Sequence, residues 1–578
     1  MNLRHWKIRS RLLSRCLSLV IIVLLCEACA DLALATPAEG QGLKPILDYI
    51  SAAWDTLTRS MSDCKSVVDP KINGTPVLYL PVGFSEPVAI EKLAADCKVR
   101  VEHLPAVIHR LGEIDASKIQ PDGLLYLENK YVVPGGRFNE MYGWDSYFII
   151  RGLLESGRLE LARGMVENFF FEIEHYGAML NANRTYYLTR SQPPFLSSMV
   201  VDVYEAEKKN GAQLDRTWLE RAYSDLEKDY GMWTRNPHLA GQTGLSRYYD
   251  FGEGPPAEAV QDETGFYRKV AGYFFFHPAE ADDYVVEEKP SSTEAVAGAT
   301  YSLQVCDATS STATTACEKA RQFKLSTDYY KGDRSMRESG FDVSFRFGPF
   351  GAATHHYAPV CLNSLLYKTE KDMEQISLWL GRSEDARRWN KRSSERRKLI
   401  TQYLWDDSKG LFFDFNFQTK RMSNYRYATT FYPLWAGLAT REQAKAVVGN
   451  LKPFEKPGGL AMSTEESGAQ WDLPYGWANI EMLTIVGLRR YGYNTDADRI
   501  SYEFLSTVVE NFRRDGNIRE KYNVVTRSSE AHVELGYEMN VVGFGWTNAT
   551  FLELLHGLPK EMLERLENNQ NQALPAAK

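Results

Sequence analysis

One short stretch of the chain concentrates the residue types that bind a neutral ring bearing hydroxyl groups. Residues Pro134–Phe148 contain two adjacent glycines, an arginine, two carboxylates and several aromatic rings. Glycine lets the backbone approach a ligand, aromatic faces cover its apolar side, and Arg137 and Asp145 can hydrogen-bond its hydroxyl groups. The same residues could instead form a tight turn that enters an aromatic-rich helix, so this stretch alone leaves both interpretations open.

A second stretch favours the binding interpretation. Residues Gln470–Trp477 repeat a Trp-Asp pair among Pro, Gly and further aromatic residues. In this order along the chain, both stretches resemble the two signature motifs of the trehalases, inverting glycoside hydrolases that split α,α-trehalose into two glucose molecules. The resemblance runs from about Gly123 to about Leu558. It implies an all-α fold, an (α/α)6 barrel or helical toroid with short hairpin-bearing loops and a central site.

Hydrolysis of a glycosidic bond with inversion requires two carboxyl groups, an acid and a base, about 6.5–9.5 Å apart. The resemblance implies that Asp342 is the general acid, because Glu338–Asp342 is similar to the family's Glu-Ser-Gly-Trp-Asp segment, with Phe341 in place of Trp. An aromatic neighbour and a close backbone would raise the pKa of this carboxyl group. The structural alternative is that Asp342 caps the segment that follows it.

The general base implied by the resemblance is Glu520, which lies in a Glu-Lys-Tyr segment similar to that of the family. Its neighbours Arg519 and Lys521 would favour the ionised carboxylate if either side chain points toward it. The alternative is a solvated run of charged residues after a turn at Asp515–Gly516.

Further positions match the substrate-binding residues of the family one by one. Arginine suits this role because it stays charged and donates hydrogen bonds in a fixed fork. A structural salt bridge is the alternative for Arg137 and Arg190. The implied substrate-binding residues are Arg137, Trp144, Asp145, Asn181, Arg190, Ser191, Gln192, Glu258, Gly340 and Glu538.

Departures from the family pattern fall on substrate-contacting or lid positions and spare both catalytic carboxylates. Pro256 stands where the family has an arginine, and a later arginine, such as Arg268, is a candidate replacement. Tyr475 stands where Asn is usual. The glycine-rich lid has lost most of its glycines, and its glutamate is matched by Glu538, with Glu534 as a rival. These changes bear on which substrate the protein binds more than on the type of reaction that it catalyses.

The composition argues against several classes of function. The 578-residue chain has 44% hydrophobic residues, enough for a large core, and a net charge of −8, so no basic excess can neutralise phosphates. We therefore expect no nucleic-acid partner. We also expect no cofactor or metal, because phosphate-cradling and His-Glu-x-x-His motifs are missing from the sequence, and His355-His356 is expected in a loop. The expected state is a monomer that binds a disaccharide.

The N-terminal residues predict export. Basic residues precede a nine-residue apolar run, Leu17–Leu25, that is too short to span a bilayer, and Ala33–Ala35 offers a cleavage site. We therefore predict a signal peptide at residues 1–35 and a periplasmic or secreted protein with no stable membrane insertion after cleavage. Retention as an anchor and earlier cleavage at Ala28–Ala30 are alternatives, and the residues before Cys29 fit a lipid-attachment site poorly.

Five cysteines lie beyond this N-terminal region, and pairing is expected in an exported protein. The local pairs Cys64–Cys97 and Cys306–Cys317 are the economical disulfides. Cys361, in an apolar run, would then be a free buried thiol.

Beyond the predicted signal peptide, the pattern divides the chain into three parts. We predict an N-terminal region at 36–120 that packs on the barrel, a catalytic domain at 121–560 with an insertion at about 265–330, and a disordered tail at 561–578. Val77–Val88 is predicted to be a loop. Apolar residues that recur every three or four positions predict helices. These helices are Leu43–Leu57, Ala89–Leu111, Leu153–Tyr176, Arg216–Thr234, Cys361–Leu380, Glu384–Leu404, Arg441–Leu451, Trp477–Tyr491 and Ala497–Arg514.

Together, the N-terminal residues and the resemblance imply an exported α,α-trehalase that hydrolyses trehalose to two glucose molecules with inversion of configuration. The alternative is an inverting glycosidase of the same fold that acts on another α-glucoside. A third reading is an inactive sugar-binding protein, whose binding would not depend on Asp342 and Glu520 acting as acid and base.

Overall fold

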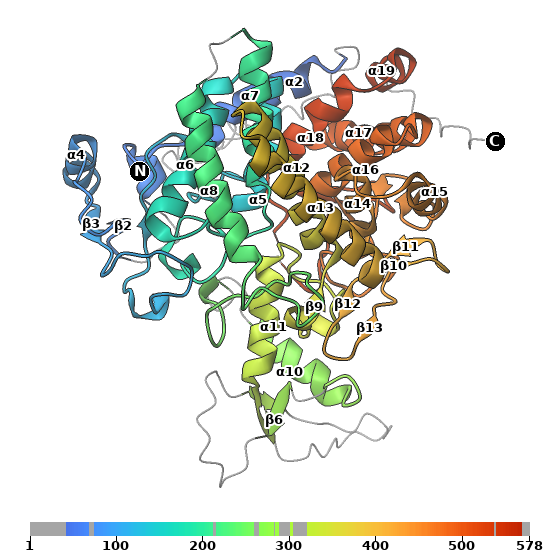
Figure 1. Cartoon of the computed structure of the whole chain (residues 1–578), viewed down its shortest axis with the longest axis horizontal. Coiled ribbons are helices and arrows are strands. Elements are labelled where there is room, and N and C mark those ends of the chain that lie inside the picture. Colours follow the sequence, from blue (N-terminus) through green and yellow to red (C-terminus); the bar gives the residue numbers. More distant parts are fainter. Residues whose placement is uncertain are drawn as a thin grey trace, which may run out of the picture.

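The computed structural model describes residues 42–68, 74–211, 215–258, 265–281, 284–287, 301–303, 321–536 and 539–568. Helices dominate this part of the chain, and its strands are short (Figure 1). The prediction of an all-α protein is therefore confirmed.

Within the described residues, six helices form a closed inner ring. Each contacts the next in chain order, and α18 returns to α5, so the first and last members pack together. Their bounds are α5 Gly143–Glu155, α7 Leu196–Lys209, α12 Val360–Trp379, α14 Tyr432–Trp435, α16 Ala478–Arg490 and α18 Gly545–His556. The closed ring is the centre of an (α/α)6 barrel, as the sequence predicts.

Each inner helix is followed along the chain by a helix on the outside of the ring. The outer helices are α6 Leu159–Tyr176, α8 Arg216–Trp233, α13 Ser383–Leu404, α15 Arg441–Gly449, α17 Asn494–Asp515 and α19 Lys560–Glu567. The sequence explains this division. Nearly every side chain of α5 is buried, whereas α13 buries one stripe and exposes charged residues on its other faces.

Short antiparallel strand pairs occupy several loops of the barrel, in agreement with the predicted hairpins. β10 pairs with β11, β12 with β13 and β9, and β14 with β15. Their bounds are β9 Tyr357–Ala358, β10 Trp405–Asp406, β11 Leu411–Phe412, β12 Phe415–Asn416, β13 Arg421–Met422, β14 Glu455–Lys456 and β15 Gly459–Leu460. A further pair, β16 Tyr475–Trp477 with β17 Lys521–Asn523, places Trp477 opposite Lys521. Single 3-10 turns are η1 Ala116–Lys118, η2 Thr185–Tyr187, η3 Pro349–Gly351, η4 Thr354–His356 and η5 Ala428–Phe431.

The region before the barrel contains a small sheet and a helix that contacts α18. This helix is α2 Lys44–Leu57. The other elements are β1 Thr58–Arg59, α3 Cys64–Val67, β2 Val77–Leu80, α4 Val88–Cys97, β3 Arg100–His103, β4 Leu124–Leu125 and β5 Tyr131–Val132. β1 pairs with β5, and β2 lies between β3 and β4 in a parallel sheet, so the prediction of a loop from Val77 is wrong over β2. The helix predicted over Ala89–Leu111 stops at Cys97, because Lys98 is left-handed (φ 56°) and the chain continues as β3.

The cysteines of the described residues behave as predicted. Cys64 and Cys97 form a disulfide that joins α3 to the end of α4, with a Cα–Cα distance of 5.4 Å. Cys361 is a free, buried thiol on α12. The predicted pair Cys306–Cys317 and the predicted signal peptide at 1–35 lie outside the described residues. The tail predicted to be disordered from residue 561 begins instead as helix, because α19 continues to Glu567; residues 569–578 lie outside the described residues.

Two helices between α8 and α12 carry a second hydrophobic cluster. α10 Phe266–Phe276 and α11 Thr327–Glu338 pack their aromatic residues together beside an antiparallel sheet of β6 Val285–Glu287, β8 Arg321–Leu325 and β7 Tyr301–Leu303 (Figure 1). α10 and the sheet fall within the predicted insertion at 265–330, so one face of that segment is core rather than surface. α11 ends just before the segment that carries Asp342.

The helical periodicity recovers most barrel helices but not all of them. The helix predicted over Leu153–Tyr176 is two helices, because the chain turns at Ser156–Arg158 between α5 and α6. Among the described helices from α5 onward, those without a predicted counterpart are α7, α10, α11, α14, α18 and α19. α11 buries charged side chains and α18 is buried on most sides, so neither shows the apolar stripe that marks a surface helix.

None of the described helices combines the length and the apolar character needed to cross a bilayer.

A buried carboxyl group on α8 makes the stability of the fold depend on pH. Asp229 is buried, and its Oδ1 has no hydrogen-bond partner. Burial raises the pKa of Asp229 to about 7, although a hydrogen bond from the backbone of Met179 opposes the shift. An unfolded aspartate titrates near pH ~3.9, so the unfolded chain releases a proton that the folded chain keeps. The contribution of Asp229 to stability is therefore greatest below about pH 4 and is lost as the pH rises toward 7.

We expect the substitution Asp229→Asn to raise the Tm relative to the unmodified chain by several degrees at pH 8 and to change it little near pH 4.5. The amide keeps the shape of the carboxyl group and carries no proton to lose. Thermal melts across this pH range measure the effect, with the exposed Asp407→Asn as the matched control. An equal shift at both pH values would contradict the assignment.

Candidate active site

A pocket is lined by side chains from inner helices and from the segments between them. It brings together residues that are far apart in the sequence. The predicted site residues that line it are Arg137, Trp144, Asp145, Asn181, Arg190, Gln192, Glu258, Gly340, Asp342 and Glu520. Ser191 does not line the pocket, and Glu538 lies outside the described residues.

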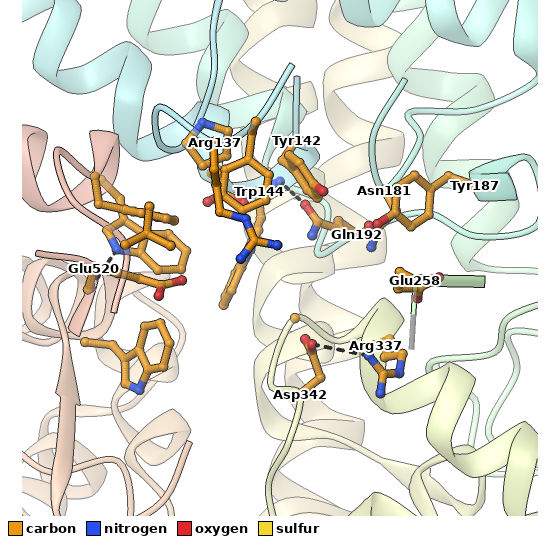
Figure 2. Close-up of a pocket in the computed structure, with 18 of the residues that line it drawn as sticks. Arg137, Tyr142, Trp144, Asn181, Tyr187, Gln192, Glu258, Arg337, Asp342 and Glu520 are labelled. Atoms are coloured by element: carbon orange, nitrogen blue, oxygen red, sulfur yellow. Dashed lines mark hydrogen bonds and ion pairs between the residues drawn. The ribbon is translucent and has the colours of Figure 1, made fainter. Parts of the chain in front are cut away.

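Asp342 and Glu520 face the pocket from two different parts of the chain. Figure 2 shows them on opposite sides of the pocket, with the guanidinium group of Arg137 pointing into the space between them. Asp342 comes from the loop after α11, and Glu520 from the loop between α17 and β17. The two carboxyl groups therefore flank one ligand-sized space.

Tryptophan rings form an apolar wall of this pocket. Trp471 stacks on Trp477 with ring centroids 3.7 Å apart and planes within 5°. Trp144 lies 5.7 Å from Trp471 and 5.8 Å from Trp546. Phe341, where the family has Trp, packs edge-on against both Trp144 and Trp471 and so completes the cluster.

The backbone beside Asp342 is held close to this wall. Gly340 has a φ of +77°, and a Cβ there would lie 2.7 Å from Cζ2 of Trp144, so only glycine fits. Gln470 donates a hydrogen bond from Nε2 to the carbonyl oxygen of Asp342 at 2.5 Å. These contacts fix the position from which the Asp342 side chain enters the pocket.

Arg337 lines the pocket next to Asp342, although the sequence analysis did not select it. Its Nη1 lies 3.9 Å from Oδ2 of Asp342. Arg337 directly precedes the motif Glu338–Asp342 that identified Asp342, and this position is the signal that could have found it. Arg268, suggested as the replacement for the arginine lost at Pro256, is exposed on α10 and does not line the pocket, so that suggestion is wrong.

A buried hydrogen-bonded chain from α10 supports Arg337. Nε of Arg337 donates to Oδ1 of Asp333 at 3.2 Å, and the hydroxyl of Tyr267 donates to Oδ2 of Asp333 at 2.8 Å. The guanidinium group also lies 5.7 Å from the ring of Phe266. All four side chains are buried. Charge pairing and hydrogen bonding offset the cost of burying the guanidinium and carboxylate groups.

Glu520 is paired with a buried lysine. Nζ of Lys521 lies 3.1 Å from Oε2 of Glu520, and Lys521 is fully buried over the ring of Trp477. Arg519 points elsewhere, toward Asp515 and the backbone of Asn540. The indole of Trp546 donates to the carbonyl oxygen of Glu520 at 3.1 Å. Of the two cations flanking Glu520 in sequence, the structure therefore directs Lys521 toward it.

Asp145 is electrostatically coupled to both of these carboxyl groups. Burial in the first turn of α5 raises the pKa of Asp145 well above its usual value, and the charges of Glu520 and Asp342 raise it further. Three carboxyl groups thus share one enclosed space. A neutral ligand rich in hydroxyl groups suits this arrangement, because it can hydrogen-bond both ionised and protonated carboxyls.

Arg190 and Glu258 form an ion pair in the pocket, and Nη1 of Arg190 also lies 3.6 Å from Oδ2 of Asp250. Burial alone would raise the pKa of Glu258, but Arg190 and Arg337 outweigh it and hold that pKa below its usual value. Arg190 therefore forms a structural salt bridge, as the alternative interpretation expects, and it also lines the pocket.

The amide side chains and Ser191 have different placements. Oε1 of Gln192 accepts from the backbone N–H of Trp144 at 2.9 Å, which orients the start of α5. Nδ2 of Asn181 donates to the carbonyl oxygen of Ser191 at 3.3 Å. The hydroxyl of Ser191 donates to the backbone of Met179 at 2.6 Å and is fully buried. Ser191 therefore supports the loop from beneath the pocket.

Of the two lid candidates, Glu534 and Glu538, the structure describes only Glu534. Glu534 does not line the pocket, and its carbonyl oxygen accepts from Nζ of Lys269 on α10 at 3.2 Å. Val541 and Phe544, farther along the same segment, do line it. His355 and His356, expected in a loop, lie in η4, away from the pocket.

Comparison with solved structures gives the same architecture. The chain aligns with the structure titled neutral trehalase Nth1 from Saccharomyces cerevisiae with a TM-score of 0.72 and 33% sequence identity, covering 91% of this chain and 96% of that one. A likeness of this extent includes the barrel and its loops.

Sequence relatives extend this finding. Cytosolic neutral trehalase of Saccharomyces cerevisiae is 36% identical over 560 residues, which cover 86% of this chain and 69% of the relative. Cytosolic neutral trehalase of Emericella nidulans is 35% identical over 588 residues, which cover 90% and 72%.

The prediction of an exported, periplasmic or secreted protein is wrong in the light of these relatives. Those from Saccharomyces cerevisiae, Emericella nidulans and Neurospora crassa are named cytosolic neutral trehalases. A basic segment before a short apolar run is a compositional pattern, and by itself it does not establish a signal peptide.

The family comparison covers nearly the whole described barrel. The trehalase family model matches residues 38–559, a range that contains every described residue of the pocket. On this match and on the relatives above, the chain belongs to the trehalase family and is a glycoside hydrolase.

Proposed function

We propose that this protein hydrolyses α,α-trehalose to two glucose molecules with inversion at one anomeric carbon, and that Asp342 and Glu520 are its acid and base. The observation that carries the proposal is the arrangement of the two carboxyl groups on opposite sides of one pocket (Figure 2). The names of the relatives support trehalose as the substrate.

In this mechanism Asp342 donates its proton to the oxygen that joins the two glucose units. Glu520 takes a proton from a water molecule on the opposite face of the sugar, and that water attacks the anomeric carbon. One glucose leaves with its configuration unchanged, and the other is released inverted. Protonated Asp342 and ionised Glu520 exchange states during the reaction and are restored by proton exchange with solvent.

The remaining polar groups of the pocket suit the binding of sugar hydroxyls. Arg137, Arg190 and Arg337 provide donors, while Asp145 and Glu258 provide acceptors. The tryptophan wall offers flat apolar faces to the carbon-bound hydrogens of a pyranose ring. Since the cations and carboxylates largely balance, the pocket favours a neutral sugar over a charged one.

The alternative substrate, another α-glucoside, rests on Pro256, Tyr475 and the altered lid. Neither Pro256 nor Tyr475 lines the pocket, and the hydroxyl of Tyr475 donates to the backbone of His532 at 2.7 Å. Arg337 supplies a guanidinium group beside Asp342. These placements favour trehalose and leave the lid as the segment on which the alternative depends.

The first test is a proton NMR time course with trehalose. We expect equal initial amounts of α- and β-glucose, because one product is inverted and the leaving glucose keeps its α configuration. Formation of α-glucose alone would refute inversion. An absence of glucose, with cleavage of another α-glucoside, would transfer the assignment to the alternative substrate.

The roles of the two carboxyl groups are tested by Asp342→Asn and Glu520→Gln. Each should lower kcat by about 10²–10⁴-fold or more, because general acid or base catalysis is lost while the fold is kept. The exposed Glu253→Gln is the matched control and should retain full activity. If both pocket variants still bind trehalose and hydrolyse it at the normal rate, the assignment of acid and base fails.

The support of Arg337 by α10 is tested with Tyr267→Phe. Loss of the hydrogen bond to Asp333 should leave this carboxylate less well paired and loosen Arg337. If the transition state loses about 1 kcal/mol of stabilisation, kcat/KM falls roughly 5-fold. Tyr273→Phe on the same helix is the control, since the hydroxyl of Tyr273 donates to Glu280 instead. Equal effects of the two variants would show that Arg337 does not depend on Tyr267.

A further inference from the structure

A second group of chemically reactive side chains lies outside the pocket, at the start of α11. Asp328 is in the first turn of α11, and His355 and His356 are in η4. One oxygen or nitrogen atom from each residue lies within 4.8 Å of the corresponding atoms of the other two. None of the three lines the catalytic pocket, so the proposed hydrolysis does not use them.

The spacing of the donor atoms is close to that of a tetrahedral metal site. Oδ1 of Asp328 lies 2.9 Å from Nε2 of His355 and 3.8 Å from Nε2 of His356. In a tetrahedral site with metal–ligand bonds of about 2.0–2.2 Å, neighbouring ligand atoms are roughly 3.3–3.6 Å apart. The two distances bracket this value, and a bound ion would replace the hydrogen bond between Asp328 and His355.

The backbone of η4 holds both imidazoles in place. The carbonyl oxygen of His355 accepts from Nη1 of Arg247 at 2.7 Å, and that of His356 accepts from the N–H of Phe417 at 3.0 Å. The ring of His355 is buried; its Nε2 is hydrogen-bonded to Oδ1 of Asp328 at 2.9 Å, and its Nδ1 has no hydrogen-bond partner in the described part of the chain. Nε2, the nitrogen that faces Asp328, is therefore the atom that could bind an ion shared with this carboxylate.

The exposure of the group suits metal binding. The Asp328 side chain is 47% exposed and that of His356 is 23% exposed, so an ion and a water ligand can reach the site.

We propose that Asp328, His355 and His356 form a binding site for a divalent transition-metal ion of the Zn²⁺ class. Two imidazoles and one carboxylate are ligands preferred by Zn²⁺ and Co²⁺, whereas Ca²⁺ and Mg²⁺ prefer oxygen ligands. Three protein ligands leave the fourth position to water. The bound ion would join the first turn of α11 to η4. Since the other end of α11 carries Arg337, the site anchors the helix that reaches the catalytic pocket.

A titration with Co²⁺ tests this site directly. The full chain, first freed of metal with a chelator, should bind one equivalent of Co²⁺ and develop the visible absorption of four-coordinate cobalt. Zn²⁺ should displace the signal and raise the Tm, because an ion that binds only the folded state stabilises it. No absorption and no change of Tm with either ion would overturn the proposal.

Substitutions identify the ligands. His355→Gln, His356→Gln and Asp328→Asn should each weaken Co²⁺ binding at least 10-fold. The Asp328 side chain is partly exposed, and asparagine has nearly the same shape as aspartate. Asp328→Asn therefore remains informative if a histidine variant fails to fold. The matched control is His109→Gln, which removes an exposed histidine that pairs with Glu113 and belongs to no group of three potential metal ligands among the described residues. Undiminished binding in all three ligand variants would refute this site even if the chain binds cobalt.

Discussion

The closure of the inner ring by α5 and α18 is the constraint on which the rest of the structure depends. A Cβ at Gly152 of α5 would lie 2.6 Å from Cβ of Ala549 on α18, so the two helices are nearly in backbone contact. Arg151 and Glu553 join the same helices by a paired hydrogen bond. Because α5 begins with Trp144 and Asp145 and α18 begins with Trp546, the close approach of the helices also sets the width of the pocket. A larger side chain at Gly152 would move α5 away from α18, and with them Trp144 away from Trp546.

The charges in the pocket are held by pairing rather than by solvent. Arg190 with Glu258, Arg337 with Asp333, and Lys521 with Glu520 are buried or nearly so. A buried ion that loses its partner is strongly destabilising. Arg190 and Arg337, which line the pocket, are therefore also part of the internal structure. The pair of Arg337 with Asp333 explains why a pocket residue comes from α11 as well as from the ring, since the partner of this arginine is buried with it.

Much of this site was predictable from the sequence because its residues occur in compact motifs. Asp342, Glu520, Arg137 and Asp145 are found with their aromatic neighbours, and the structure places all four in one pocket. Arg337 has only its position beside the Asp342 motif as a sequence signal; its burial against Asp333 from its own helix and the support from Tyr267 on α10 are visible only in the structure.

Other predictions failed for physical reasons of the same kind. The short strands β2 and β3 pair with each other across α4, and local periodicity contains no information about such pairing. Ser191 matches the family motif, but its hydroxyl is directed to the backbone of Met179. The export prediction relied on composition alone, whereas the relatives are named cytosolic.

The contact between α5 and α18 also has a consequence for the synthesis of the chain. Arg151 and Glu553 are 402 residues apart, and the ribosome releases the C-terminal partner last. Until then α5 has no partner on that side, and the apolar face around Gly152 remains open to solvent or to other proteins. Nascent chains that stop before α18 would contain Asp342 and Glu520 but no closed barrel around them. The ring therefore makes completion of the polypeptide a condition for catalysis, and it leaves a long interval in which a chaperone could protect the exposed face of α5.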